Sequence, residues 1–269
     1  MVWTSLSTLN FKALKSKKVP HEISYKIATR FDNILIRILI GSAVLSTIFI
    51  ALNFLKFEFV DENILFFINA FIALIAVVYF VLEFFKEEMF QKAEIERKQD
   101  FIDNSLNTRL SLQNSSGYYS NDTIDPSFFK LGVNCFENTY FTYKVSKKML
   151  PLAVIKFLFV LILFVFVALF SGNQLLLLVF QVPLPYVLLK DSYKTYRLNQ
   201  SVCEILEKFQ SIFSYDKTNG LNELIINNVI SYEKVLSTYS ILLNSKLFDK
   251  MNNDLSNEWE ELKIKYNIF

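Results

Sequence analysis

The chain has little histidine, cysteine or glycine, and these scarcities exclude several kinds of site. Its 269 residues include one histidine, His21, and two cysteines, Cys135 and Cys203, so no Cys/His cluster has the spacing of metal ligands. The five glycines are scattered and form no phosphate-binding loop, and the single histidine lies in a basic terminal tail, apart from any Ser-His-Asp set. The sequence therefore predicts neither an enzyme nor a cofactor, and it leaves an enzyme that acts on lipid as the open alternative.

A large excess of charge of one sign is also missing. Lysine and arginine number 28 and aspartate and glutamate number 26, which gives a net charge of +2. Because binding to nucleic acid relies on concentrated positive charge, we expect no direct nucleic-acid binding. Apolar side chains are abundant instead, since 52% of the residues are hydrophobic.

The apolar residues gather in four long stretches, which run from Ile34 to Leu55, Ile64 to Phe85, Leu150 to Ser171 and Gln174 to Leu189. A hydrocarbon core of about 30 Å takes about 20 helical residues to cross, so each stretch is a candidate span. The fourth is the shortest, and a buried core helix is the alternative for it. We predict an all-α membrane protein with four transmembrane helices, arranged as two hairpins, plus a helical cytoplasmic domain.

Lysine and arginine flank these stretches unevenly. The first 33 residues and the long middle region are rich in both, whereas the loop from Lys56 to Asn63 has one lysine against three acidic residues. Positively charged flanks usually stay inside the cell, so both termini and the middle region are predicted to be cytoplasmic. The predicted parts are a basic N-terminal segment (1–33), a first hairpin (34–85), a stalk, loop and helix (86–149), a second hairpin (150–189) and a helical tail (190–269).

Local signals predict helices in the cytoplasmic parts. The stretch from Glu83 to Leu106 has no glycine or proline and is rich in good helix formers, which predicts a stalk continuous with the second span. Asp125 followed by Pro126 is typical of a helix start, and Pro151 is expected to interrupt that helix at the membrane. The tail is predicted to form helices over 191–215, 221–251 and 255–266, with breaks at 217–220 and 252–254.

Four residues within the predicted spans are candidates for lining or gating a pore. Asn69 and Gln181 carry amides that need hydrogen-bond partners in hydrocarbon, so they join helices or line a wet cavity. Pro183 and Pro185 follow Gln181 and remove backbone donors, which is expected to kink or unwind the inner half of the fourth span. A kinked last helix with an amide at its bend could gate a pore, or it could be a static re-entrant segment.

The order of these features is similar to that of a known family. A helix leaves the membrane into Ile95–Leu110 (IERKQDFIDNSLNTRL), Gly117-Tyr118-Tyr119 follows, VNCFENTYFTYKVSKKML from Val133 leads into the third span, and Asn244–Trp259 lies in the tail. The layout resembles the SMODS-associated four-transmembrane effectors of bacterial antiphage defence, which partner cGAS-like nucleotidyltransferases. The Leu-Pro-Trp-Asn sequence associated with the family's first motif is replaced by SLNTRL.

The resemblance implies an oligomeric effector in the bacterial inner (plasma) membrane, multi-pass with both termini cytoplasmic, that perturbs or permeabilises the membrane when triggered from the cytoplasm. The implied partners are membrane lipid, further copies of the chain, and a cyclic oligonucleotide or a cytoplasmic defence protein. The candidates for binding a nucleotide are basic and aromatic residues of the middle region: Arg97, Lys98, Arg109, Tyr118, Tyr119 and Lys130. The alternative for each is an ordinary surface or packing role.

A second hypothesis belongs to a different class. The chain would be a non-conducting membrane sensor or scaffold subunit that recruits a cytoplasmic defence partner. Under that hypothesis, substitutions in the spans that preserve assembly are neutral, whereas a pore or ion channel is sensitive to them.

Overall fold

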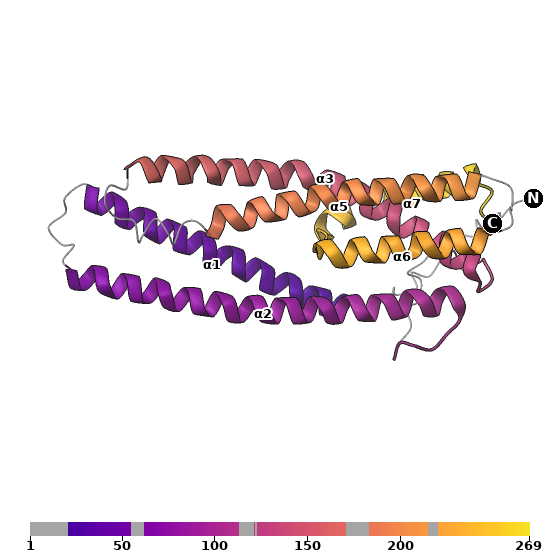
Figure 1. The fold of residues 1–269 in the computed structure, drawn as a ribbon, viewed down its shortest axis with the longest axis horizontal. Coiled ribbons are helices and arrows are strands. Elements are labelled where there is room, and N and C mark those ends of the chain that lie inside the picture. Colours follow the sequence, from indigo (N-terminus) through magenta and orange to yellow (C-terminus); the bar gives the residue numbers. More distant parts are fainter. Residues whose placement is uncertain (1–20, 55–61, 113–120, 122, 171–182, 215–219) are drawn as a thin grey trace, which may run out of the picture.

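A computed structural model describes residues 21–54, 62–112, 121, 123–170, 183–214 and 220–269. Within these residues the chain is all-helical, with six helices and no strand, as predicted (Figure 1). The helices are α1 (Glu22–Phe54), α2 (Glu62–Leu106), α3 (Phe128–Phe170), α5 (Pro183–Ser214), α6 (Leu221–Tyr239) and α7 (Ser245–Lys265).

The long helices form two pairs. Helix α1 packs along α2, and α3 packs along α5, while α6 and α7 cover only one end of the molecule (Figure 1). One side of α1 is buried at helical spacing: Ala28, Leu35 and Leu39 are all less than 9% exposed. The molecule therefore has an open half, made of the long helices, and a packed half in which the shorter helices join them.

The packed half has an aromatic core. Phe136 of α3 is fully buried and stacks on Phe209 and Phe213 of α5, with ring centroids 5.7 and 5.4 Å apart. Trp259 of α7 meets the same ring edge-on at 5.2 Å. A single phenylalanine thus joins three helices, and we call the four rings of Phe136, Phe209, Phe213 and Trp259 the aromatic core.

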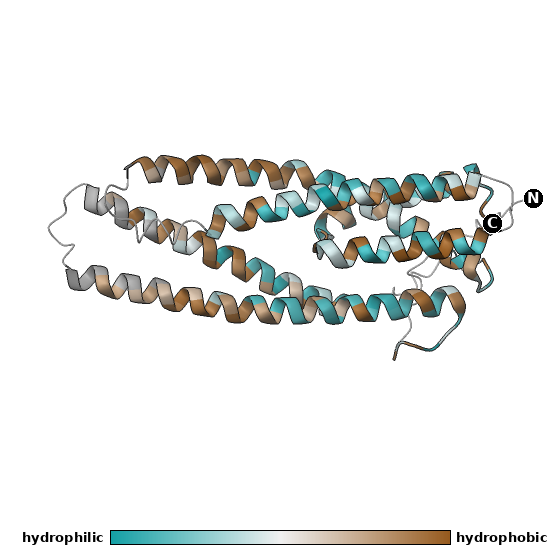
Figure 2. Cartoon of the chain, viewed as in Figure 1, coloured by the Kyte–Doolittle hydropathy of each residue, from teal (hydrophilic) through white to brown (hydrophobic). Residues whose placement is uncertain are grey.

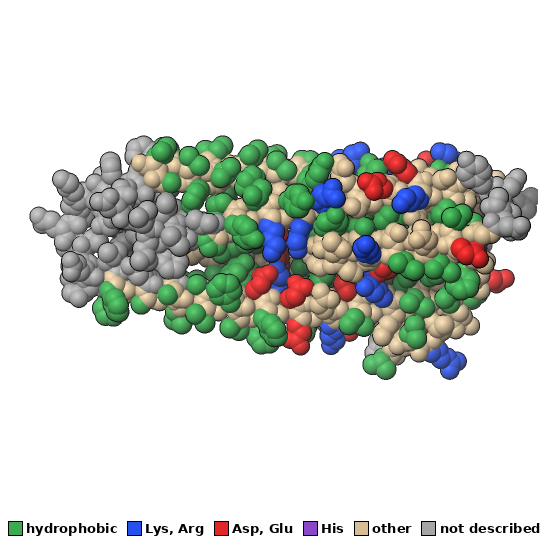
Figure 3. Space-filling view, viewed as in Figure 1, with side chains coloured by type: hydrophobic (Ala, Val, Ile, Leu, Met, Phe, Trp, Pro, Cys, Tyr) green, Lys and Arg blue, Asp and Glu red, His purple; other side chains and the backbone are tan. Residues whose placement is uncertain are grey.

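The open half exposes its large apolar side chains instead. The exposed residues include Phe67, Phe71, Leu74, Phe80 and Phe84 of α2 and Ile155, Phe159, Ile162, Phe166 and Leu169 of α3. Figure 2 shows this half as mostly hydrophobic. On the face drawn in Figure 3, the charged side chains of the described residues lie in the middle and the packed half. A continuous apolar surface of this extent is a site of contact with a partner or a membrane.

One helix among the described residues is long and apolar enough to cross a membrane. It covers Phe128–Phe166, and its most apolar window has a mean hydropathy of 2.8 with none of its residues buried. This finding indicates membrane association. The other three predicted spans stay a prediction.

A continuous helix through the predicted stalk is confirmed, and α3 begins two residues after the predicted start at Pro126. Helix α2 runs without a break to Leu106. Helix α3 begins at Phe128, because the Ser127 hydroxyl accepts a hydrogen bond from the Lys130 backbone N–H at 3.2 Å, while Asp125 is exposed.

Pro151 lies inside α3 and does not interrupt it, which corrects a second prediction. A proline within a helix removes one backbone hydrogen bond and crowds the preceding turn. In the turn before this one, the Asn199 amide of α5 donates to the Tyr143 carbonyl at 3.0 Å and to the Ser146 hydroxyl at 2.9 Å. Contact with α5 thus holds the helix just ahead of the proline.

The break in the tail lies earlier than predicted. Gly220, at φ 92°, starts α6 near the expected turn, but α6 ends at Tyr239 and α7 runs through 252–254. Ser240 adopts a left-handed conformation with φ 47°, and its N–H bonds to the Leu236 carbonyl. Asn244 then caps α7 by accepting a hydrogen bond from the Leu247 N–H at 3.0 Å. These two caps decide where α6 ends and α7 begins.

Candidate functional site

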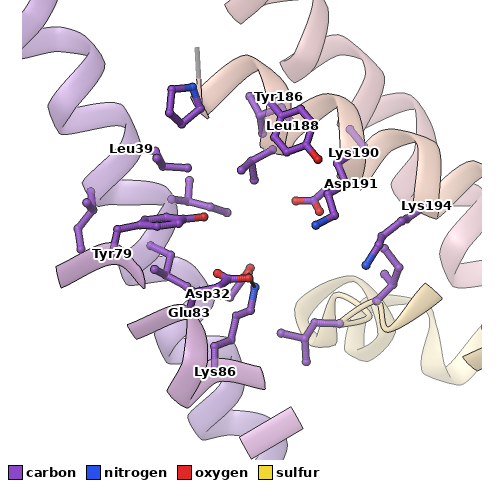
Figure 4. A pocket seen from close by; sticks show the side chains of 18 of the residues that line it. Asp32, Leu39, Tyr79, Glu83, Lys86, Tyr186, Leu188, Lys190, Asp191 and Lys194 are labelled. Carbon is purple, nitrogen blue, oxygen red and sulfur yellow. Dashed lines mark hydrogen bonds and ion pairs between the residues drawn. The ribbon is translucent and has the colours of Figure 1, made fainter. Parts of the chain in front are cut away.

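A cavity of about 830 Å³ lies between the two helix pairs, where the open half meets the packed half. Side chains from α1, α2, α3 and α5 line it, together with the segment 240–244 between α6 and α7. Figure 4 shows its charged residues extending from opposite walls toward one another. The cavity is therefore bounded by both hairpin regions and by the packed half.

The wall formed by α1 and α2 carries a charge cluster with internal partners. The Lys86 ammonium lies 2.8 Å from a Glu83 carboxylate oxygen and 3.6 Å from an Asp32 carboxylate oxygen. Burial disfavours the charge on Lys86, but the hydrogen bond with Glu83 and the nearby carboxylates of Glu83, Asp32 and Asp191 outweigh it and raise its pKa. Burial also raises the pKa of Asp32, and Lys86 offsets part of that rise.

The wall formed by α5 carries Lys190, Asp191 and Lys194. No described residue makes an ion pair within 4 Å with any of the three. Burial is the main cause that raises the pKa of Asp191, and the nearby charge of Asp32 raises it further. An aspartate therefore faces another aspartate across the cavity.

The charge on Asp191 is expected to lower stability. Because its pKa is raised on folding, Asp191 favours the folded state most at acidic pH, and this contribution is lost as the pH rises through the folded-state pKa. Asp191→Asn is expected to raise the melting temperature by about 2 °C at pH 7.5. The gain should vanish as the pH approaches the ordinary aspartate pKa of about 3.9. Thermal unfolding of detergent-solubilised protein across this pH range measures it, and a lower melting temperature at pH 7.5 would contradict it.

The cavity combines these charges with an apolar surface. Leu39 of α1, Ile75 of α2 and Leu152 of α3 line it beside the charged residues. Among the described residues, no group of three or more His, Cys, Asp or Glu could hold a metal ion. The arrangement suits an amphipathic molecule, because pockets with apolar walls and a few convergent polar groups bind such ligands.

One of the four predicted pore residues, Pro183, lines this cavity. Pro183 and Pro185 occupy the first turn of α5, where a proline's missing N–H costs little. Gln181 lies outside the described residues. The inner half of the predicted fourth span was expected to kink or unwind, but from Pro183 to Leu189 it is helical. Asn69 lies within α2, and its side chain is also outside the description.

The predicted nucleotide-binding residues are not brought together as one site. Arg97 and Lys98 lie 2.6 and 3.8 Å from Glu233 of α6, and Arg97 also lies 3.1 Å from Glu94. Arg109 is exposed after the end of α2, and Lys130 is buried near the start of α3. Tyr118 and Tyr119 lie outside the described residues.

His21 was assigned to a terminal tail, and the structure corrects this. The ring is buried, with Nδ1 4.0 Å from an Asp100 carboxylate oxygen of α2. The sequence contains a pattern that extends α1 to this residue. Four residues that are buried in the structure recur every seven positions: His21, Ala28, Leu35 and Ser42. The buried stripe of α1 therefore begins more than three turns before the apolar stretch that starts at Ile34.

A buried polar network holds the loop between α2 and α3. Asn134 donates to the side chains of Asn104 and Ser105, both at 3.0 Å, and accepts from Asn121 at 2.9 Å. Asp103 accepts hydrogen bonds from the backbone of residues 110 and 111 and from two hydroxyls; these outweigh its burial and lower its pKa to about 2. These contacts explain why the residues before the third predicted span are polar.

Comparison with protein families, curated proteins and solved structures finds no match to this chain. The features of the molecule that bear on function are therefore the exposed apolar half, the packed half and the cavity between them.

Proposed function

We propose that the chain is an oligomeric inner-membrane effector of antiphage defence, which perturbs or permeabilises the membrane when triggered from the cytoplasm. In this proposal the open half lies in the bilayer as four spans, with both termini and the packed half in the cytoplasm. The exposed apolar side chains of α2 and α3 support a lipid-facing half. The charged band beside them, at Asp32, Lys86 and Asp191, is suited to the inner membrane surface.

The observation that carries the proposal is the continuity of α2 and α3 between the two halves. They contain 45 and 43 residues without a break, which corresponds to about 65 Å at 1.5 Å per residue. A bilayer core of about 30 Å uses half of that length. A rearrangement of the packed half would therefore move the apolar half directly, because no flexible linker intervenes.

The trigger is proposed to be a cyclic oligonucleotide or a cytoplasmic defence protein that acts on the packed half. Asn69, Gln181, Pro183 and Pro185 are proposed to line or gate the path through the membrane. Arg109 is the exposed basic residue among the described nucleotide-binding candidates and is available to a ligand, whereas Arg97 already has carboxylate partners.

The proposal predicts that softening α2 uncouples the trigger from the membrane. Glu88 and Lys92 are exposed on α2 between the two halves. Replacing both by glycine costs about 2 kcal/mol of helix stability, whereas replacing both by alanine maintains the helix. We expect the glycine pair to reduce dye leakage from liposomes at least about fivefold, the effect of about 1 kcal/mol. The alanine pair should leak like the parent protein, with a panel of cyclic dinucleotides and trinucleotides as the probe.

Membrane potential in induced cells provides the second readout. The parent chain should collapse the potential, and Gln181→Leu or Pro183→Ala should alter that response. An intact potential during full activation would contradict the proposal. Recovery of a stoichiometric soluble partner, with the potential intact, would identify the non-conducting sensor or scaffold instead.

A further inference from the structure

The cavity has an apolar part and a charged part, which are ordered along the helices. Leu39 lies about two turns along α1 from Asp32, toward the apolar half. Figure 4 shows Lys190, Asp191 and Lys194 extending from α5 toward Asp32, Glu83 and Lys86. A ligand that matches this order has an apolar body directed into the open half and a charged end at the level of Asp191.

The two walls differ in what they leave for a ligand. On the α1–α2 wall, Lys86 already has Glu83 and Asp32 as partners. On the α5 wall, one carboxylate and two ammonium groups have no ion-pair partner among the described residues, although Asp191 is largely removed from water. A head group that carries one cation and one anion would satisfy both kinds of charge on this wall.

We propose that the cavity binds a phospholipid with a zwitterionic ethanolamine head group. Its ammonium bonds to Asp191, its phosphate bonds to Lys190 and Lys194, and its acyl chains extend past Leu39 into the apolar half. The proposal rests on the membrane location given above. The cavity of about 830 Å³ is within the usual range of ligand pockets, about 300–1,000 Å³, and holds the head group with the first part of the chains.

The charges also distinguish ethanolamine from other head groups. The methylated ammonium of choline cannot donate a hydrogen bond, so it loses the charge-assisted bond to Asp191. A glycerol head group supplies the phosphate for Lys190 and Lys194 but carries no cation, so it makes no charge-assisted hydrogen bond to Asp191. Ethanolamine is the head group that supplies both partners.

Native mass spectrometry of the full chain in detergent tests this assignment. Phosphatidylethanolamine, phosphatidylcholine and phosphatidylglycerol with identical chains are titrated separately. We expect one phosphatidylethanolamine per protein chain, with the other two lipids bound about tenfold more weakly, the effect of one charge-assisted hydrogen bond. Asp191→Asn should weaken phosphatidylethanolamine binding about tenfold. The control Asp254→Asn, an exposed carboxylate of α7, should leave it unchanged.

Three results would overturn the proposal: equal affinity for the three lipids, unchanged phosphatidylethanolamine binding in Asp191→Asn, or full competition by soluble glycerophosphoethanolamine. Misfolding does not explain a loss of binding if Asp191→Asn also has the raised melting temperature expected of it. The dye-leakage assay separates the two proposals. Leakage without selective lipid binding overturns the lipid site alone, and selective lipid binding without any loss of membrane potential overturns the effector function alone.

Discussion

Arg97→Ala is expected to lower the melting temperature of the protein by about 10 °C, which corresponds to about 3 kcal/mol. The Arg97 guanidinium donates to both carboxylate oxygens of Glu233, at 3.0 and 2.6 Å, and to Glu94 at 3.1 Å. Burial disfavours the charge on Arg97, but the two carboxylates outweigh it and raise its pKa well above the ordinary value. Removing the guanidinium leaves Glu94 without its cation and Glu233 with only the more distant Lys98, which costs more than the Arg97 pair itself contributes.

Matched variants separate this role from ligand binding. Arg97→Lys keeps the charge but loses the two-pronged geometry, so it should restore only part of the lost stability. Lys92→Ala, at an exposed position of the same helix, should change the free energy of unfolding by less than about 0.5 kcal/mol. If Arg97→Ala instead kept the parent melting temperature and lost only the response to cyclic nucleotides, Arg97 would be a ligand contact, as the sequence first indicated.

Local composition predicted a helix boundary correctly where nearby residues alone decide it. The run of good helix formers before Leu106 predicted the stalk, and α2 ends at that residue. The end of α6 was missed because Ser240 adopts a left-handed conformation that a serine rarely takes, while the asparagines at 252–254 lie inside α7. Asparagine is only mildly unfavourable in a helix, so tertiary packing decides whether it ends one.

The candidate site was harder to predict because its partners are distant in the sequence. Lys86 lies in the run of good helix formers, whose local pattern indicates no partner, yet it pairs with Asp32 from another helix. Arg97 and Glu233 are separated by 136 residues, and nothing in the local pattern of either residue indicates the other. The apolar stretches predicted where two helix pairs would lie, but the cavity between them depends on how the pairs splay apart.

Phe136→Ala is expected to cost about 3–5 kcal/mol of unfolding free energy. The Phe136 ring is fully buried and contacts Phe209, Phe213 and Trp259, so its removal leaves a cavity at the centre of the aromatic core. Phe136→Leu retains most of the volume and should cost about 1.5 kcal/mol or less. Thermal unfolding measures both variants, with Phe128→Ala as the control, because Phe128 lies on the same helix and is 43% exposed.

Fluorescence reports whether the aromatic core itself has opened. Trp3 and Trp259 are the two tryptophans, so Trp3→Phe leaves Trp259 as the only indole emitter. In that background Phe136→Ala should shift Trp259 emission to the red below the melting temperature, because the loosened core lets water reach the indole N–H, which is buried without a hydrogen-bond partner in the described structure. Phe128→Ala should leave the emission unchanged. Unshifted emission together with a parent-like melting temperature would contradict the central position of Phe136.

Because the Phe136 ring joins α3, α5 and α7, its loss should also reduce triggered dye leakage, even in variants that still insert into the membrane.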